Sequence, residues 1–193
     1  MSREDADVRF TAEDLRDLGA LVLEAWESAV DEDWSVRAGT LEWSCLHTAD
    51  HTIDCVFSYA FFLASLRQDA YPNFGELHAN PGAGASDMID GLRAVVRLLH
   101  AMIVTADPED RAIMLYRPEP TVAAPDAFAA RGGLELILHA HDVCTGLGVP
   151  FDPPRDLCER LWHDTADWPG NTAVVMSDDR WSDLLARSGR PRP

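Results

Sequence analysis

The sequence predicts an all-α protein, because apolar residues recur at intervals of three and four over four long segments. No segment alternates convincingly between apolar and polar residues, and Val174-Val175-Met176 is too short and isolated to form a sheet. Stretches rich in proline and glycine separate the apolar segments. These observations indicate a bundle of four helices, each of about 20 residues, followed by a short helical extension.

The first helix is predicted to start after Thr11, since Thr11-Ala12-Glu13-Asp14 resembles a capping box. Its apolar pattern ends in the acidic stretch 31–33. The second helix is expected to start after Gly39, with Thr40 as its cap, and to run to about Arg67.

Ser86 is the expected cap of the third helix, which ends before Pro108. The fourth is expected to run from about Asp126 to Leu147, because Gly148 followed by a proline is a common helix ending. We therefore divide the chain into a bundle, residues 1–150, and a helical extension packed on the same domain, residues 151–193. Two short helices are expected in the extension: Arg155 to Asp167 and Trp181 to Arg187.

The charge of the chain excludes several classes of partner. Its 16 lysines and arginines against 33 aspartates and glutamates give a net charge of −17, which argues against binding to nucleic acid or to anionic lipid. No apolar run approaches the ~20 residues of a membrane span. The acidic start, with Glu4, Asp5 and Asp7, is unlike a signal peptide, and the four cysteines form no CxxC pair. We expect a cytoplasmic protein with reduced thiols.

Two of the predicted helices carry metal-binding residue types one turn apart. On the second helix, His47 and His51 lie about 40° apart around the axis. On the fourth helix, Glu135 and His139 have the same spacing, and Asp142 continues their stripe. Carboxylate and imidazole groups from facing helices are a common way to hold a divalent cation inside a bundle.

The surroundings of Glu135 strengthen this interpretation. Glu135 stands between Leu134 and Leu136, where a carboxylate is costly to bury without a partner cation. His141 lies roughly 240° from Glu135 on the helical wheel and points away. The alternative is that such pairs are ordinary features of solvated helix faces, since pairs at this spacing are common by chance.

The helical wheel also ranks the polar residues of the second helix. Its apolar stripe is centred near three residues: Leu46, Phe57 and Ala64. His47 lies roughly 100° from this centre and His51 roughly 140°, so His47 is expected to point further inward. Asp50 lies about 40° from the centre and is a candidate buried carboxylate that hydrogen-bonds a ligand imidazole.

The layout resembles that of a known family. It consists of Trp34-Ser35-Val36, then Leu46-His47-Thr48-Ala49-Asp50-His51, and about ninety residues later Glu135-Leu136-Ile137-Leu138-His139-Ala140-His141-Asp142-Val143. Over residues 11–150 it is similar to the DinB-like metal-dependent bundle superfamily, in particular the mycothiol-dependent maleylpyruvate isomerase N-terminal domain branch. The resemblance implies a four-helix bundle that binds zinc through His47, Glu135 and His139. Nickel is the alternative metal.

The resemblance implies an enzyme that activates a low-molecular-weight thiol such as mycothiol for S-transfer or isomerization of a small-molecule substrate. His51, Asp50 or Arg131 would then move protons or anchor an anionic substrate, although Arg131 also fits a surface charge. The alternatives are a hydrolase that uses metal-bound water and a non-catalytic metal-binding bundle. A fourth protein ligand, such as His51 or Asp142, would favour the non-catalytic alternative. A homodimer is compatible with the sequence.

Overall fold

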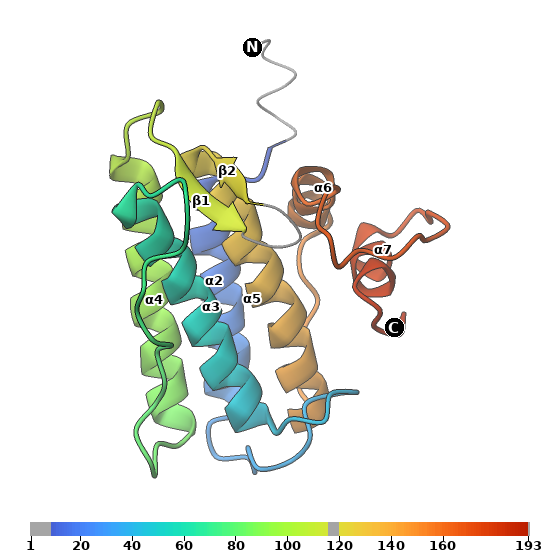
Figure 1. The fold of residues 1–193 in the computed structure, drawn as a ribbon. Coiled ribbons are helices and arrows are strands. Elements are labelled where there is room, and N and C mark those ends of the chain that lie inside the picture. The colour runs from blue at the N-terminus through green and yellow to red at the C-terminus, as the bar shows by residue number, and fades with distance from the viewer. Residues whose placement is uncertain (1–8, 116–119, 193) are drawn as a thin grey trace.

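The computed structural model of the chain describes residues 9–115 and 120–192. Glu4, Asp5 and Asp7, on which the expectation of no signal peptide rests, lie outside the described residues. The structure is mostly helical, as predicted (Figure 1). Its elements are α2 (Ala12–Ser28), α3 (Cys45–Ser65), α4 (Ala85–Thr105), β1 (Ala112–Leu115), β2 (Thr121–Ala123), α5 (Pro125–Leu147), α6 (Arg155–Asp164) and α7 (Arg180–Arg187).

The four long helices α2 to α5 lie side by side, and α2 and α3 each contact both α4 and α5. Their apolar faces meet in one core that also includes residues of the carboxyl-terminal extension. Some of its largest fully buried side chains are Phe10, Leu15, Leu18, Trp26, Leu63, Met88, Leu92, Leu99, Phe128, Leu136 and Ile137. Among the described helices, none has both the length and the apolar character that crossing a membrane requires.

Two of the predicted helix ends are confirmed at the level of single residues. Thr11 caps α2, and its side chain and that of Asp14 exchange hydrogen bonds with each other's backbone in a capping box. The fourth long helix, α5, ends at Leu147 as predicted, and Gly148 after it has a left-handed conformation with φ of 71°. A residue without a Cβ adopts that conformation at little cost.

The start of the second helix was predicted wrongly. Ser44, rather than Thr40, caps α3, and its hydroxyl accepts a hydrogen bond of 3.2 Å from the backbone of His47. Residues 35–44 instead form a turn that is closed by backbone hydrogen bonds. The N–H of Ala38 donates to the carbonyl of Trp43, and the N–H of Cys45 donates to the carbonyl of Val36. This turn depends on backbone pairing and on contacts with the end of α5, which helix-capping signals do not report.

Two smaller boundaries also differ from prediction. Gly84 caps α4, so Ser86 lies inside the first turn of that helix, and α6 ends at Asp164, before the predicted Asp167. The short antiparallel sheet was not predicted at all. Its strands pair Ala112 with Ala123, and β1 lies against α3. Both strands are too short to show a period of two.

The extension packs directly on the long helices. Its helices α6 and α7 contact each other, and α6 contacts α5. Leu157, Leu161 and Leu185 are buried in the common core. Arg160 forms an ion pair of 2.7 Å with Asp14 at the start of α2. The extension is therefore held by both apolar burial and a partly buried ion pair.

Gly146, near the end of α5, provides a test of this packing. A Cβ there would lie 2.4 Å from the carbonyl oxygen of Arg37 and 2.6 Å from Sγ of Cys45. We expect Gly146→Ala to lower the free energy of unfolding by about 1–3 kcal/mol, because the turn before α3 must move. Gly75→Ala, which meets no atom within 4 Å, is the control and should change it little. Equal effects in urea unfolding would contradict the packing of this turn on α5.

Candidate metal centre

Three residues that can bind a metal follow one another on α3 at intervals of one turn. His47 is exposed, His51 is half-buried, and Cys55 is half-buried one turn further on. The prediction that His47 points further inward than His51 is therefore wrong. The ring of Trp43 covers this end of the stripe, with its centroid 4.7 Å from the ring of His47 and 5.0 Å from that of His51.

The error has a physical reason in the core face of α3. The helix buries small polar residues, including Thr48 and Thr52, together with Val56 at the centre of its face, whereas Leu46 and Phe57 are only half-buried. The centre of the face thus lies about 100° from the centre of the apolar residues alone. Thr52 satisfies its hydroxyl with the carbonyl of Thr48 at 2.7 Å, which lets a threonine face the core.

His51, Cys55 and Glu135 form a cluster in which one ligand atom of each lies within 4.8 Å of the others. His51 and Cys55 come from α3, and Glu135 comes from α5, which packs against it. Nε2 of His51 is 3.4 Å from Sγ of Cys55. Nitrogen, sulfur and carboxylate oxygen are the donors that zinc prefers in proteins, and the cluster can hold such an ion.

His139 stands next to this cluster, one turn after Glu135. Its Nε2 is 3.6 Å from Oε2 of Glu135, and its ring centroid is 5.1 Å from that of His51. Its Nδ1 lies 3.1 Å from Oδ2 of Asp142, which is almost completely buried. Because Nδ1–H of His139 donates a hydrogen bond to this carboxylate, the lone pair of Nε2 is left free on the side of the cluster.

Asp142 is itself fixed by the extension. Nε and Nη2 of Arg190 donate to its two oxygens at 2.8 and 2.6 Å. Burial raises the pKa of Asp142, but the hydrogen bonds from His139 and Arg190 outweigh it, so the pKa lies below its ordinary value. Both oxygens therefore have partners, and Asp142 orients His139 in this structure.

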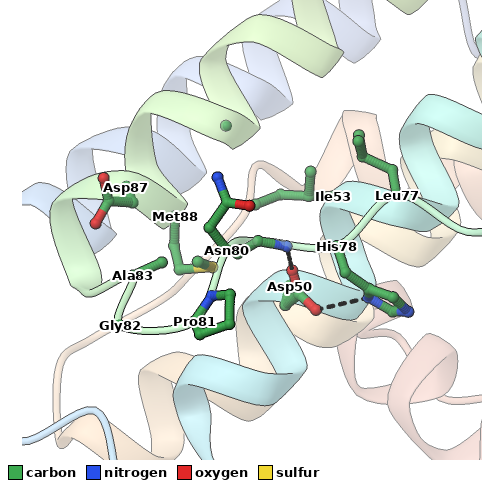
Figure 2. Close-up of a pocket in the computed structure, with 12 residues that line it drawn as sticks. Asp50, Ile53, Leu77, His78, Asn80, Pro81, Gly82, Ala83, Asp87 and Met88 are labelled. Atoms are coloured by element: carbon green, nitrogen blue, oxygen red, sulfur yellow. Dashed lines mark hydrogen bonds and ion pairs between the residues drawn. The ribbon is translucent and has the colours of Figure 1, made fainter.

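The remaining predicted residues lie elsewhere. His141 packs against Trp181 of α7, with ring centroids 5.4 Å apart, away from the cluster as expected. Asp50 accepts hydrogen bonds from Nδ1 of His78 and the backbone of Ala79, so it anchors a loop rather than a ligand imidazole. Figure 2 shows this arrangement at a cavity of about 480 Å³, which no residue of the metal cluster lines.

Arg131 differs most from its expected surface position. Only 4% of this residue is exposed, so the interpretation as a surface charge is wrong. It lies on α5 one turn before Glu135 and stacks on Trp168, 4.6 Å from the ring centroid. The sequence could not show this burial, because the covering residues follow in the extension.

Burial shifts the pKa of each group in the cluster toward its neutral form. Burial raises the pKa of Glu135, although the charges of His139, Arg190 and Arg131 oppose that shift. Burial, followed by the charge of His139, lowers the pKa of His51. Burial also raises the pKa of the Cys55 thiol well above its usual range. Binding of a metal by Cys55 would therefore release the proton of its thiol.

No protein-family model, curated protein or solved structure gives a significant match to this chain. The chemistry of the cluster must then be argued from its own residues. A cavity of about 240 Å³ adjoins it between α5 and the extension. Glu135 and His139 line one side of this cavity, and Trp168, Asn171 and Arg187 line the other.

Asp142 can be tested apart from any metal. In chelator-treated protein at pH 7, we expect Asp142→Asn to lower the free energy of unfolding by about 3 kcal/mol, because it leaves Arg190 without its carboxylate. Since the folded-state pKa of Asp142 is below 3.8, its contribution is full above that pH and disappears as the pH falls through the folded value. Urea unfolding at several pH values measures both effects.

Asp90→Asn is the matched control, since Asp90 pairs with Arg93 at the surface with 78% of its side chain exposed. It should change stability by less than about 1 kcal/mol. If the two variants behave alike at pH 7, the buried network around Asp142 has no energetic importance.

Proposed function

We propose that this chain is a metal-dependent enzyme that holds one divalent ion through His51, Glu135 and His139 and activates a small thiol. The observation that carries the proposal is the meeting of α3 and α5 donors, with Glu135 central to both. His51 takes the position that the resemblance to the DinB-like family gave to His47. His47, one turn earlier on α3, is exposed.

The spacing of the donors supports this ligand set. Ligands at 2.0–2.3 Å from a tetrahedral zinc ion lie about 3.3–3.8 Å from one another. Nε2 of His139 and Oε2 of Glu135 are already 3.6 Å apart. His51 is 5.1 Å from His139 between ring centroids, so a small side-chain movement completes the set.

The chain's own residues prepare the site for an open coordination position. Asp142 and Arg190 hold His139 with Nε2 directed to Glu135. Trp43 covers the rings of the α3 histidines, and the cavity beside Glu135 and His139 gives a small molecule access. When bound, a divalent ion with three protein ligands supplies a Lewis-acid centre that lowers the pKa of a thiol or water at the fourth position.

The proposed reaction class is S-transfer or thiol-assisted isomerization. Zinc, with nickel as the alternative, suits imidazole and carboxylate donors. A low-molecular-weight thiol such as mycothiol is the cosubstrate that the resemblance suggests. A cavity of about 240 Å³ accommodates the reactive end of such a thiol or a small substrate.

Metal content tests the ligand set. We expect protein purified without chelator to contain about one divalent ion per chain, and His51→Ala, Glu135→Gln and His139→Ala each to abolish its retention. His47→Ala and His141→Ala are the matched controls and should retain the ion. Retention by His51→Ala together with loss in His47→Ala would contradict the proposed set, and a folded protein that takes up no metal would overturn the function.

Cys55 favours a second candidate, a closed site without catalysis. Its Sγ is 3.4 Å from Nε2 of His51, within the range that two ligands of one zinc ion occupy. A bound ion would ionise this thiol, and four protein ligands would leave no position for a substrate.

Cobalt substitution separates the open and closed sites. In the proposed open site, the cobalt protein shows no thiolate-to-cobalt charge-transfer band until an external thiol is added, and Cys55→Ala keeps its metal. In the closed site, the band is present from the start and Cys55→Ala loses it along with much of its metal affinity. Absorption spectra of the two proteins before and after addition of a thiol give the answer.

A further inference from the structure

Arg131 buries a positive charge that its own neighbours satisfy only in part. Its Nη2 forms an ion pair of 2.6 Å with Asp167, whose side chain is 78% exposed. Its Nη1 is buried and has no hydrogen-bond partner among the described residues. Because a guanidinium stays charged, a buried N–H group without a partner is costly unless a ligand supplies one.

Arg187 of α7 is a second buried guanidinium close to the first. It is 5% exposed and stacks on Trp162 at 3.9 Å. It donates to the carbonyl of Trp162 at 3.1 Å and to the hydroxyl of Thr165 at 2.5 Å, both neutral acceptors. In the part of the chain that the structure describes, no carboxylate forms an ion pair with it. Burial and the charge of Arg131 lower the pKa of Arg187 to about 10.

Arg187 borders the candidate metal centre, and Arg131 stacks on Trp168, which borders it too. Arg187 lines the same cavity as Glu135 and His139. Trp168, on which Arg131 stacks, lines it as well. Arg190 also borders the cavity, but Asp142 already neutralises its charge. Among the described residues, one mostly exposed carboxylate, that of Asp167, pairs with Arg131, and none pairs with Arg187.

We propose that Arg131 and Arg187 form an anion subsite that binds a carboxylate or phosphate group of the small molecule whose reacting group reaches the metal. This inference rests on the proposed function and defines its substrate class as a small organic acid or phosphate ester. An anion held here would accept a charge-assisted hydrogen bond from Nη1 of Arg131, which otherwise has no partner among the described residues. The cavity of about 240 Å³ lies below the ~300–1,000 Å³ of drug-sized sites, which indicates a small ligand.

The net negative charge of the chain means that binding of an anion at the subsite is not explained by general electrostatic attraction to the protein. At −17, the protein as a whole repels anions, so saturable binding of an anion requires a local group of cations. A divalent ion at Glu135 would add further positive charge to the same cavity. Anion binding and metal binding should therefore support each other, while each remains measurable alone.

The experiment uses malonate and inorganic phosphate as probes, with neutral malonamide as the blank. Binding is measured by calorimetry and by the fluorescence of the tryptophans that stack on the two arginines, with the protein as purified and after chelator treatment. We expect one saturable site for malonate or phosphate in both samples and none for malonamide. The anion that binds more tightly shows whether the subsite prefers a carboxylate or a phosphate group.

Arg131→Gln and Arg187→Gln should each weaken this binding roughly tenfold or more, because each removes charge-assisted hydrogen bonds. Arg155→Gln removes an exposed arginine of α6 and is the matched control, with binding unchanged. If Arg187→Gln does not fold, Arg131→Gln and the conservative Arg187→Lys carry the test. Equal binding by Arg131→Gln and wild type, or no saturable binding at all, overturns the subsite.

Metal dependence separates this inference from the proposed function. Anion binding that disappears on chelation means that the anion binds the metal itself, which overturns the subsite and leaves the metal site standing. Anion binding that persists in a protein unable to take up metal supports the subsite and overturns the proposed function.

Discussion

The burial of α5 is the constraint on which the rest of the structure depends. This helix is enclosed by α2, α3, α4 and α6, yet it carries four ionisable side chains along one stripe: Arg131, Glu135, His139 and Asp142. A buried charge is stable only with partners, and a helix cannot supply all of them from its own turns. The partners come from other elements, and their arrangement defines the candidate site.

Each partner has a distinct source. The extension supplies Arg190, which pairs with Asp142, and Asp167, which pairs with Arg131. Helix α3 gives Glu135 its neighbours, His51 and Cys55. The extension therefore does more than cover apolar surface, because it holds the charges on which the orientation of His139 depends.

The sequence was sufficient for features that depend on local signals. It predicted the long helices, the Gly148 ending and the stripe of Glu135, His139 and Asp142, because these follow from spacing along a single helix. It failed for features that residues distant in the sequence determine. The start of α3 at Ser44 depends on a turn packed against α5, and the burial of Arg131 depends on Trp168. Cys55 was missed, although its place four residues after His51 was a usable signal.

The protonation of the site links its two proposed functions. Burial raises the pKa of Glu135 and of Cys55 and lowers that of His51, so it favours the neutral form of each group. Arg131 and Arg187 place buried positive charge close to the cluster, even though the chain carries a charge of −17. In the proposed site, a bound divalent ion would favour the ionised form of Glu135 and would add more positive charge than that carboxylate removes. An anion in the proposed subsite beside Arg131 and Arg187 would compensate the remainder, so the burial that shifts the proposed metal ligands would also favour a ligand of negative charge.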